Sequence, residues 1–165
     1  MSRAPEVTVR GLTLHDVDRI LEIDEACTGV PRKAGDNDLW RLIAETTTCY
    51  GVVVREQGLA HDSPDRRSGV DSGGKLVGFV LADVRPWEFG NRAHVGWIVA
   101  LGVDPAFQKH GVGKLLGDRV LQAFEKLGVS QFRTLVDRRN EQLLGYFKAL
   151  GFREGRDAVL ELGTK

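Results

Sequence analysis

The stretch that decides the fold is Trp97–Leu127, WIVALGVDPAFQKHGVGKLLGDRVLQAFEKL. Its first part, Trp97 to Val103, is a short and nearly all-apolar run, which is typical of a strand buried on both faces. Pro105 ends this strand, because proline fixes its own φ and has no backbone N–H to donate. Apolar residues then recur at helical spacing from about Gly111 to Leu127. The stretch therefore predicts a strand, a glycine-bearing turn and a helix.

The start of the predicted helix favours an anion. Its first amide groups have no intrahelical acceptor, and the helix dipole adds partial positive charge at that end. Gly111 and Gly113 remove side chains that would hold a phosphate away from the backbone, and Lys109 and Lys114 can add charge. The two glycines would equally serve to ease a tight turn. A P-loop and a dinucleotide fingerprint are excluded, since no Gly-Lys-Ser/Thr is present and Leu116 replaces the third glycine.

Length, charge and cysteine content limit the class of protein that this chain can belong to. A chain of 165 residues is expected to form a single domain, residues 1–165. The 23 basic and 23 acidic residues balance, which argues against a nucleic-acid binder. The 2 cysteines form no CxxC motif, so we expect reduced thiols and no metal site. No signal peptide or membrane span is recognisable, so we expect a cytoplasmic protein with no membrane partner.

Patterns outside this stretch predict the remaining elements. We expect strands at residues 7–9, 50–55, 75–84, 93–103 and 131–136, two short last strands at Phe152 and 158–162, and helices at 14–23, 38–45, 111–127 and 140–150. Strands that alternate with helices, together with an early hairpin, indicate an α/β (α+β) fold with a mixed sheet. Residues 57–74 are polar and rich in Gly, Ser and Asp, which predicts a flexible loop.

The pattern Gln108-x-x-Gly-x-Gly after a strand that ends in Val-x-Pro resembles the acyl-CoA signature of the GNAT superfamily of N-acetyltransferases. A second match is the run from Asn140 to Gly151-Phe152, so the resemblance covers roughly Lys75 to Leu162. It implies a central sheet of about seven strands flanked by about four helices. Strands four and five of that sheet would be parallel and splayed, so that the pantetheine arm of CoA enters between them.

The resemblance also implies which residues contact acetyl-CoA. Amides of the turn would hold the CoA diphosphate, and the amide of Leu101 would bind the thioester carbonyl. Asn140 would lie beside the pantetheine or the sulfur, although its position also suits a plain helix N-cap. The implied set is Leu101, Gly102, Val103, Gln108, Lys109, His110, Gly111, Val112, Gly113, Lys114, Asn140 and Phe147.

The usual catalytic side chains of the family are replaced here. Phe147 stands where relatives commonly carry the tyrosine that protonates the leaving thiolate, and Tyr146 lies one residue, about 100° of helical turn, away. Trp97 and Leu135 occupy the positions of the usual glutamates. We therefore consider Tyr146 as the general acid. Candidates for the general base are His94, Glu88, Asp137 and ordered water.

The expected activity is N-acetyl transfer from acetyl-CoA to a primary amine by direct attack, because a neutral amine attacks a thioester readily once it is positioned. The acceptor is a small-molecule amine or a peptide or protein N-terminus. The short connection Arg153–Asp157 favours a small amine. A non-catalytic acyl-CoA-binding regulatory module is the alternative, suggested by the missing tyrosine and glutamate, and a nucleotide-binding α/β domain is a third possibility. A homodimer is expected only by analogy with the family.

Overall fold

A computed structural model describes residues 6–31, 39–55, 74–86 and 94–163. The chain divides into two compact units, Met1–Leu135 and Val136–Lys165. The prediction of a single domain stays a prediction. Glu88 and nearly all of the predicted loop at 57–74 lie outside the described residues.

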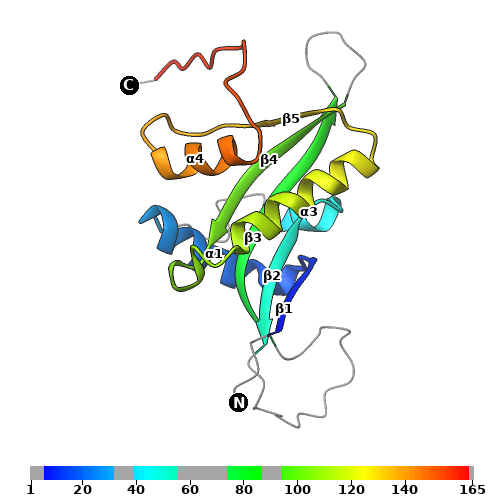
Figure 1. Cartoon of the computed structure of the whole chain (residues 1–165), viewed down its shortest axis with the longest axis vertical. Coiled ribbons are helices and arrows are strands. Elements are labelled where there is room, and N and C mark those ends of the chain that lie inside the picture. The colour runs from blue at the N-terminus through cyan, green and yellow to red at the C-terminus, as the bar shows by residue number, and fades with distance from the viewer. Residues whose placement is uncertain (1–5, 32–38, 56–73, 87–93, 164–165) are drawn as a thin grey trace. The chain divides into compact units, whose positions relative to one another are not determined.

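The first unit is built on a sheet of five strands in the order β1-β2-β3-β4-β5 (Figure 1). The strands are β1 (Glu6–Gly11), β2 (Tyr50–Arg55), β3 (Lys75–Pro86), β4 (His94–Val103) and β5 (Gln131–Thr134). Neighbouring strands are antiparallel except β4 and β5, which are parallel. The mixed sheet and its parallel fourth and fifth strands are therefore confirmed. The β-branched runs of β2 and β3 account for the strands at the centre of the sheet.

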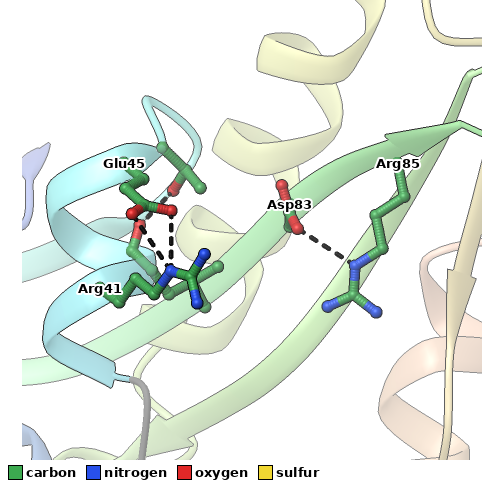
Figure 2. A pocket seen from close by; sticks show the side chains of 6 residues that line it. Arg41, Glu45, Asp83 and Arg85 are labelled. Atoms are coloured by element: carbon green, nitrogen blue, oxygen red, sulfur yellow. Dashed lines mark hydrogen bonds and ion pairs between the residues drawn. The ribbon is translucent and has the colours of Figure 1, made fainter.

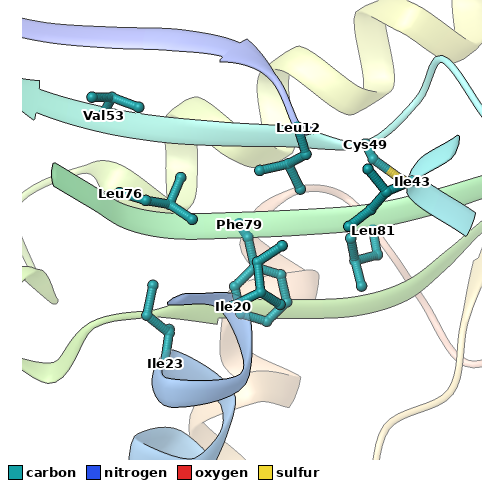
Figure 3. Close-up of a cluster of buried hydrophobic side chains, with 9 residues drawn as sticks. All are labelled: Leu12, Ile20, Ile23, Ile43, Cys49, Val53, Leu76, Phe79 and Leu81. Carbon is teal, nitrogen blue, oxygen red and sulfur yellow. The ribbon is translucent and has the colours of Figure 1, made fainter. Parts of the chain in front are cut away.

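Helices cover both faces of this sheet. These are α1 (Val17–Thr28), which follows a 3-10 turn at Leu14–Asp16, α2 (Leu39–Glu45) and α3 (Val112–Lys126). Ile20 and Ile23 of α1 and Ile43 of α2 share a buried cluster with Phe79 and Leu81 of β3 (Figure 3). This cluster defines the face that we call the α1/α2 face.

The opposite face is covered by α3, and a glycine allows the close approach. A Cβ atom placed on Gly78 of β3 would lie 2.8 Å from Val112 Cγ1 and 3.2 Å from Leu116 Cδ1. A glycine inside a strand often marks a bulge or a close backbone approach, and at Gly78 the structure shows the close approach of α3. A register shift between Val52 and Val53 of β2 lies beside it. The start of α3 is therefore packed tightly onto the centre of the sheet.

The second unit contains α4 (Glu141–Ala149), which lies one residue inside the predicted bounds of 140–150 at each end. The Asn140 side chain accepts a hydrogen bond from the Leu143 amide at 3.0 Å, and Gly151 closes the helix with a φ of +93°. Phe147 is buried, with 4% of its surface exposed, and contacts the ring of Phe152 edge to face at 5.2 Å. Across the described residues, no helix has the length and apolar character that a membrane span requires.

The two predicted C-terminal strands are not formed, so the described sheet has five strands instead of about seven. Residues 152 and 158–162 adopt no regular structure. Leu160 and Leu162 are both 92% exposed. Their alternating apolar pattern is real, but a strand requires a neighbouring edge that accepts its hydrogen bonds, and a local pattern does not supply one.

Candidate active site

The parallel strands β4 and β5 separate before β4 ends. Their pairing runs from Val95–Gln131 to Ile98–Thr134, whereas β4 continues to Val103. At the last pair, the Thr134 hydroxyl donates to the Ile98 carbonyl at 3.0 Å, so this carbonyl faces β5. Figure 1 shows the two strands diverging beyond this point. The expected splay is therefore confirmed, and residues 99–103 of β4 form an edge that β5 does not pair.

A β-bulge interrupts β4 where the splay begins. Leu81 of β3 pairs with Ala100, whereas the next residue, Ala82, pairs with Ile98. Val99 is therefore the extra residue, and 49% of its surface is exposed. One inserted residue reverses the alternation of every later residue in the strand, for side chains and for backbone groups.

The two glycines of β4 record this reversal. Gly96 and Gly102 are six residues apart and would point to the same face of a regular strand. A Cβ atom on Gly96 would lie 2.7 Å from Phe124 of α3, whereas one on Gly102 would lie 2.7 Å from Phe79 on the α1/α2 face. The two positions therefore face opposite sides of the sheet.

The bulge also aims the Leu101 amide. The Asp104 amide donates to the Val77 carbonyl of β3 at 2.8 Å, so backbone groups at odd positions before it, Leu101 and Val103, point away from β3. The Val103 carbonyl accepts instead from Gln108 Nε2 at 3.0 Å. The Leu101 N–H therefore points to the edge that the splay leaves open. In an unbulged strand this N–H would have turned towards β3.

The turn between β4 and α3 is held by its own side chains. Gln108 reaches back to β4, and His110 Nδ1 lies 2.7 Å from the Gln108 carbonyl oxygen. Lys109 and Gly111 have left-handed backbones, with φ of +62° and +82°. No atom lies within 4 Å of a Cβ placed on Gly111. The turn is therefore a fixed backbone loop with open space above its glycine.

The first turn of α3 presents backbone at this loop. The Leu115 amide donates to the Gly111 carbonyl at 3.0 Å, so the amides of Val112 and Lys114 precede the intrahelical ladder. The Val112 side chain is buried against the sheet, and the Lys114 ammonium pairs with Asp118 one turn along the helix. In this arrangement the anion-binding capacity of the helix start comes from the backbone and the dipole.

Asp104 fixes the end of β4 ahead of the turn. It accepts a hydrogen bond from the Ala106 amide at 3.0 Å and an ion pair from Arg19 of α1, whose Nε also donates to the Leu76 carbonyl. Lys75 Nζ lies 3.8 Å away. Partial burial opposes the charge of this carboxylate, but the Ala106 amide and Arg19 outweigh it and lower the pKa of Asp104. The network ties α1 to the point where the chain leaves the sheet.

The structure does not place His94, one of the candidate bases, near the Leu101 edge. His94 is the exposed first residue of β4, seven residues before Leu101, which is about 23 Å along the strand. Trp97 is half-buried, with Arg85 6.0 Å from its ring, and Leu135 is 67% exposed.

In the described part of the chain, no group of three or more His, Cys, Asp or Glu residues is arranged to hold a metal ion.

The remaining candidates, Asn140, Tyr146 and Phe147, belong to the second unit. The ring of Tyr146 meets that of Phe147 edge to face at 5.1 Å. Asn140 acts as the N-cap of α4, which is one of the two roles considered for it. Asp137 accepts hydrogen bonds from Arg139, which lower the pKa of its carboxyl to about 2. That shift disfavours Asp137 as a proton acceptor near neutral pH.

Sequence reasoning missed a charged hollow on the α1/α2 face (Figure 2). Its volume is about 350 Å³, and it is lined by Arg41, Leu42, Glu45 and Thr46 from α2 and the residue after it, and by Asp83 and Arg85 from β3. One signal was available: Asp83 follows Phe79 and Leu81 at two-residue spacing, so it faces the same side of the sheet as these buried residues.

Comparisons with known proteins agree with this architecture. The model of the acetyltransferase (GNAT) family matches residues 17–152. A mycothiol acetyltransferase of Nocardioides sp. is 26% identical over 94% of this chain and 53% of its own length. One from Propionibacterium freudenreichii subsp. shermanii is 34% identical over 71% of this chain and 40% of its own length. The chain thus spans about half, or less, of these curated relatives.

A solved structure of an aminoglycoside N-acetyltransferase in complex with CoA shares the fold, with a TM-score of 0.71 at 14% identity over 99% of this chain and 98% of the other. At that identity the likeness concerns the fold alone. The family match covers most of the chain, including the bulged strand, the glycine turn and the helix that follows. This chain belongs to the GNAT family of acetyltransferases.

Proposed function

We propose that this protein transfers an acetyl group from acetyl-CoA to a primary amine by direct attack. The observation that carries the proposal is the bulge at Val99, which turns the Leu101 N–H towards the gap between β4 and β5. An extended ligand in that gap can bond to the open edge of β4 as an added strand would. Family membership supports acetyl transfer as the class of reaction.

The turn at residues 108–114 fits the diphosphate of CoA. Gly111 offers open space above a left-handed backbone, and the start of α3 points its dipole and early amides at that space. The Gln108 side chain ties the loop to the end of β4, and His110 contacts the Gln108 carbonyl within the loop, so both act as positioning residues. Lys109 is exposed and adds positive charge near the anion, whereas the charge of Lys114 is paired with Asp118.

The reaction needs little from side chains. The amine nitrogen forms a bond to the acetyl carbon, the carbon–sulfur bond breaks and the thiolate leaves, and the proton lost by the amine passes to ordered water, one of the candidate bases. The Leu101 N–H donates to the carbonyl oxygen as negative charge develops there. A single donor of this kind typically contributes about 10²- to 10³-fold in rate. Positioning of the neutral amine against the thioester supplies the rest, and Tyr146 stays a prediction for the acid.

The test is to incubate the protein with acetyl-CoA and a panel of amines, following free thiol and the mass of the acetylated product. Thiol release that depends on an amine supports the proposal. Leu101→Pro removes the N–H without breaking the β3–β4 ladder, because that N–H points away from β3. We expect turnover to fall about 100-fold while CoA affinity changes little. Leu101→Ala keeps the N–H and is the matched control.

Two results would overturn the proposal. If acetyl-CoA binds but no amine releases thiol, the protein is an acyl-CoA-binding module. If Leu101→Pro folds, binds CoA and turns over at the rate of Leu101→Ala, the Leu101 amide does not bind the reacting carbonyl.

A further inference from the structure

The hollow on the α1/α2 face combines two ion pairs that are easily opened. Arg41 and Glu45 of α2 pair at 3.1 Å, with 59% and 62% of their side chains exposed. Arg85 and Asp83 of β3 pair at 3.1 Å, with 47% and 28% exposed. Exposed pairs of this kind contribute only about 0–1 kcal/mol each. A ligand can therefore take over their charges at little cost.

The hollow lies beside the point where β4 and β5 separate. Asp83 pairs with Trp97 in the β3–β4 register, and the last residue of β4 that pairs with β5 is Ile98. Arg85 lies over the Trp97 ring, at 6.0 Å from its centroid. Leu101 is four residues further along β4, about 13 Å away. A molecule held in the hollow by one end can thus direct its other end towards the Leu101 edge.

The charges of the hollow select the kind of group that fits. Figure 2 shows Asp83 between the α2 pair and Arg85. A group with one positive and one negative charge takes one partner from each pair and releases one carboxylate and one guanidinium, so the net charge of the hollow stays zero. A polycation would neutralise Glu45 and Asp83 but release two guanidinium groups, and a polyanion would release two carboxylates, so either would leave the hollow with a net charge. Unpaired charges of this kind work against such ligands.

Resting on the proposed function, we infer that the hollow holds the amino-carboxylate end of an acceptor whose second amine is acetylated. The acceptor is then a diamino acid, or a short peptide that ends in one. Its carboxylate binds Arg41, its α-ammonium binds Asp83, and its distal amine reaches the acetyl group at Leu101.

Three commercially available amines test the inference, because they differ by one charge at a time. Lysine carries both charges and a distal amine, cadaverine lacks the carboxylate, and 6-aminohexanoate lacks the α-ammonium. We expect kcat/KM for lysine, with acetylation at the distal nitrogen, to exceed that for each analogue by about 3- to 10-fold. Equal or better use of cadaverine would refute the inference while acetyl transfer stood.

Variants of the protein test which residue binds each charge of the acceptor. Arg41→Gln should abolish the preference for lysine over cadaverine, and Asp83→Asn the preference over 6-aminohexanoate, with the KM for acetyl-CoA unchanged. Replacing a residue with a purely structural role would lower kcat/KM for all three substrates together. Glu125→Gln removes an exposed carboxylate on α3 and should leave every preference in place.

A binding experiment distinguishes failure of the hollow as an acceptor site from failure of the proposed function. Amide chemical shifts of α2 and β3 are followed by NMR as lysine, cadaverine and 6-aminohexanoate are added to the full chain without acetyl-CoA. Tighter binding of lysine at these elements supports the hollow even if no amine is acetylated, in which case the proposed function alone fails. Absence of lysine-dependent shifts at Asp83 and Arg41 refutes the hollow whatever the activity.

Discussion

Replacing Gly111 by alanine tests the phosphate-binding role of the turn. The residue has a φ of +82°, and a side chain in this region costs roughly 1–2 kcal/mol. Alanine also lowers the conformational entropy of the unfolded chain, which offsets part of that cost. No atom lies within 4 Å of the new Cβ, so no clash adds to it. We expect the free energy of unfolding to fall by about 1 kcal/mol, which corresponds to about 2–4 °C in Tm.

The new methyl group would also stand in the space that the diphosphate is expected to occupy. We therefore expect the Kd for CoA, measured by calorimetry, to rise at least about 10-fold, or 1.4 kcal/mol. Gly128→Ala is the matched control, because Gly128 has a φ of +73° and equally open surroundings at the opposite end of α3. It should lose the same stability and keep its CoA affinity.

The comparison of these two variants decides the outcome. Wild-type CoA affinity in Gly111→Ala, or an equal loss of affinity in Gly128→Ala, would show that the diphosphate does not lie on this turn. The predicted place of CoA would then be wrong, although the strand geometry around Leu101 would be unaffected.

Three further variants probe stability. Gln108→Leu loses the hydrogen bond to β4, so urea denaturation should show a loss of about 0.5–1.5 kcal/mol. Gly96→Ala places a Cβ 2.7 Å from the buried ring of Phe124 and should lose about 1–3 kcal/mol in the same assay; wild-type stability would mean that the ring has room to move. Asp16 is buried, which opposes its charge, but hydrogen bonds from Arg10 and a backbone amide lower its pKa below the ordinary 3.8. Its contribution to stability is therefore complete above about pH 4 and is lost as the pH falls through the folded-state pKa. Asp16→Asn should be less stable at pH 7 and should show a shallower loss of stability below pH 4, and an unchanged acid profile would contradict this reasoning.

Elements with strong local signals were predictable from the sequence. The strand at 50–55 has the predicted bounds, and α4 begins after its Asn140 cap and ends before Gly151. The β-branched run and the two cap residues act within a few positions of themselves, so they need no tertiary context. The segment at 158–162 shows the limit, because its alternation has no described partner edge to pair with.

The bulge could not be predicted, although the candidate site depends on it. Val99 is a β-branched residue in an apolar run, and nothing in its type distinguishes it from Val95 or Val103. The bulge is defined by the β3–β4 register, in which Leu81 pairs with Ala100 and Ala82 pairs with Ile98. It therefore depends on the pairing of two strands and not on one residue type. The resemblance to the family predicted a role for the Leu101 amide, and the structure supplies the physical reason for its direction.

The two halves of the proposed site differ in how they are encoded. The turn relies on backbone geometry, and a left-handed position such as Gly111 favours a specific residue type, so it leaves a local motif. The hollow relies on side-chain charges from α2 and β3, about 40 residues apart, and Arg41 and Asp83 are common residue types. Replacing either residue leaves the turn, the bulge and the sheet unchanged. If both proposals hold, one or two substitutions in the hollow change acceptor preference while CoA binding is retained, whereas a substitution at Gly111 weakens the binding of the acetyl donor.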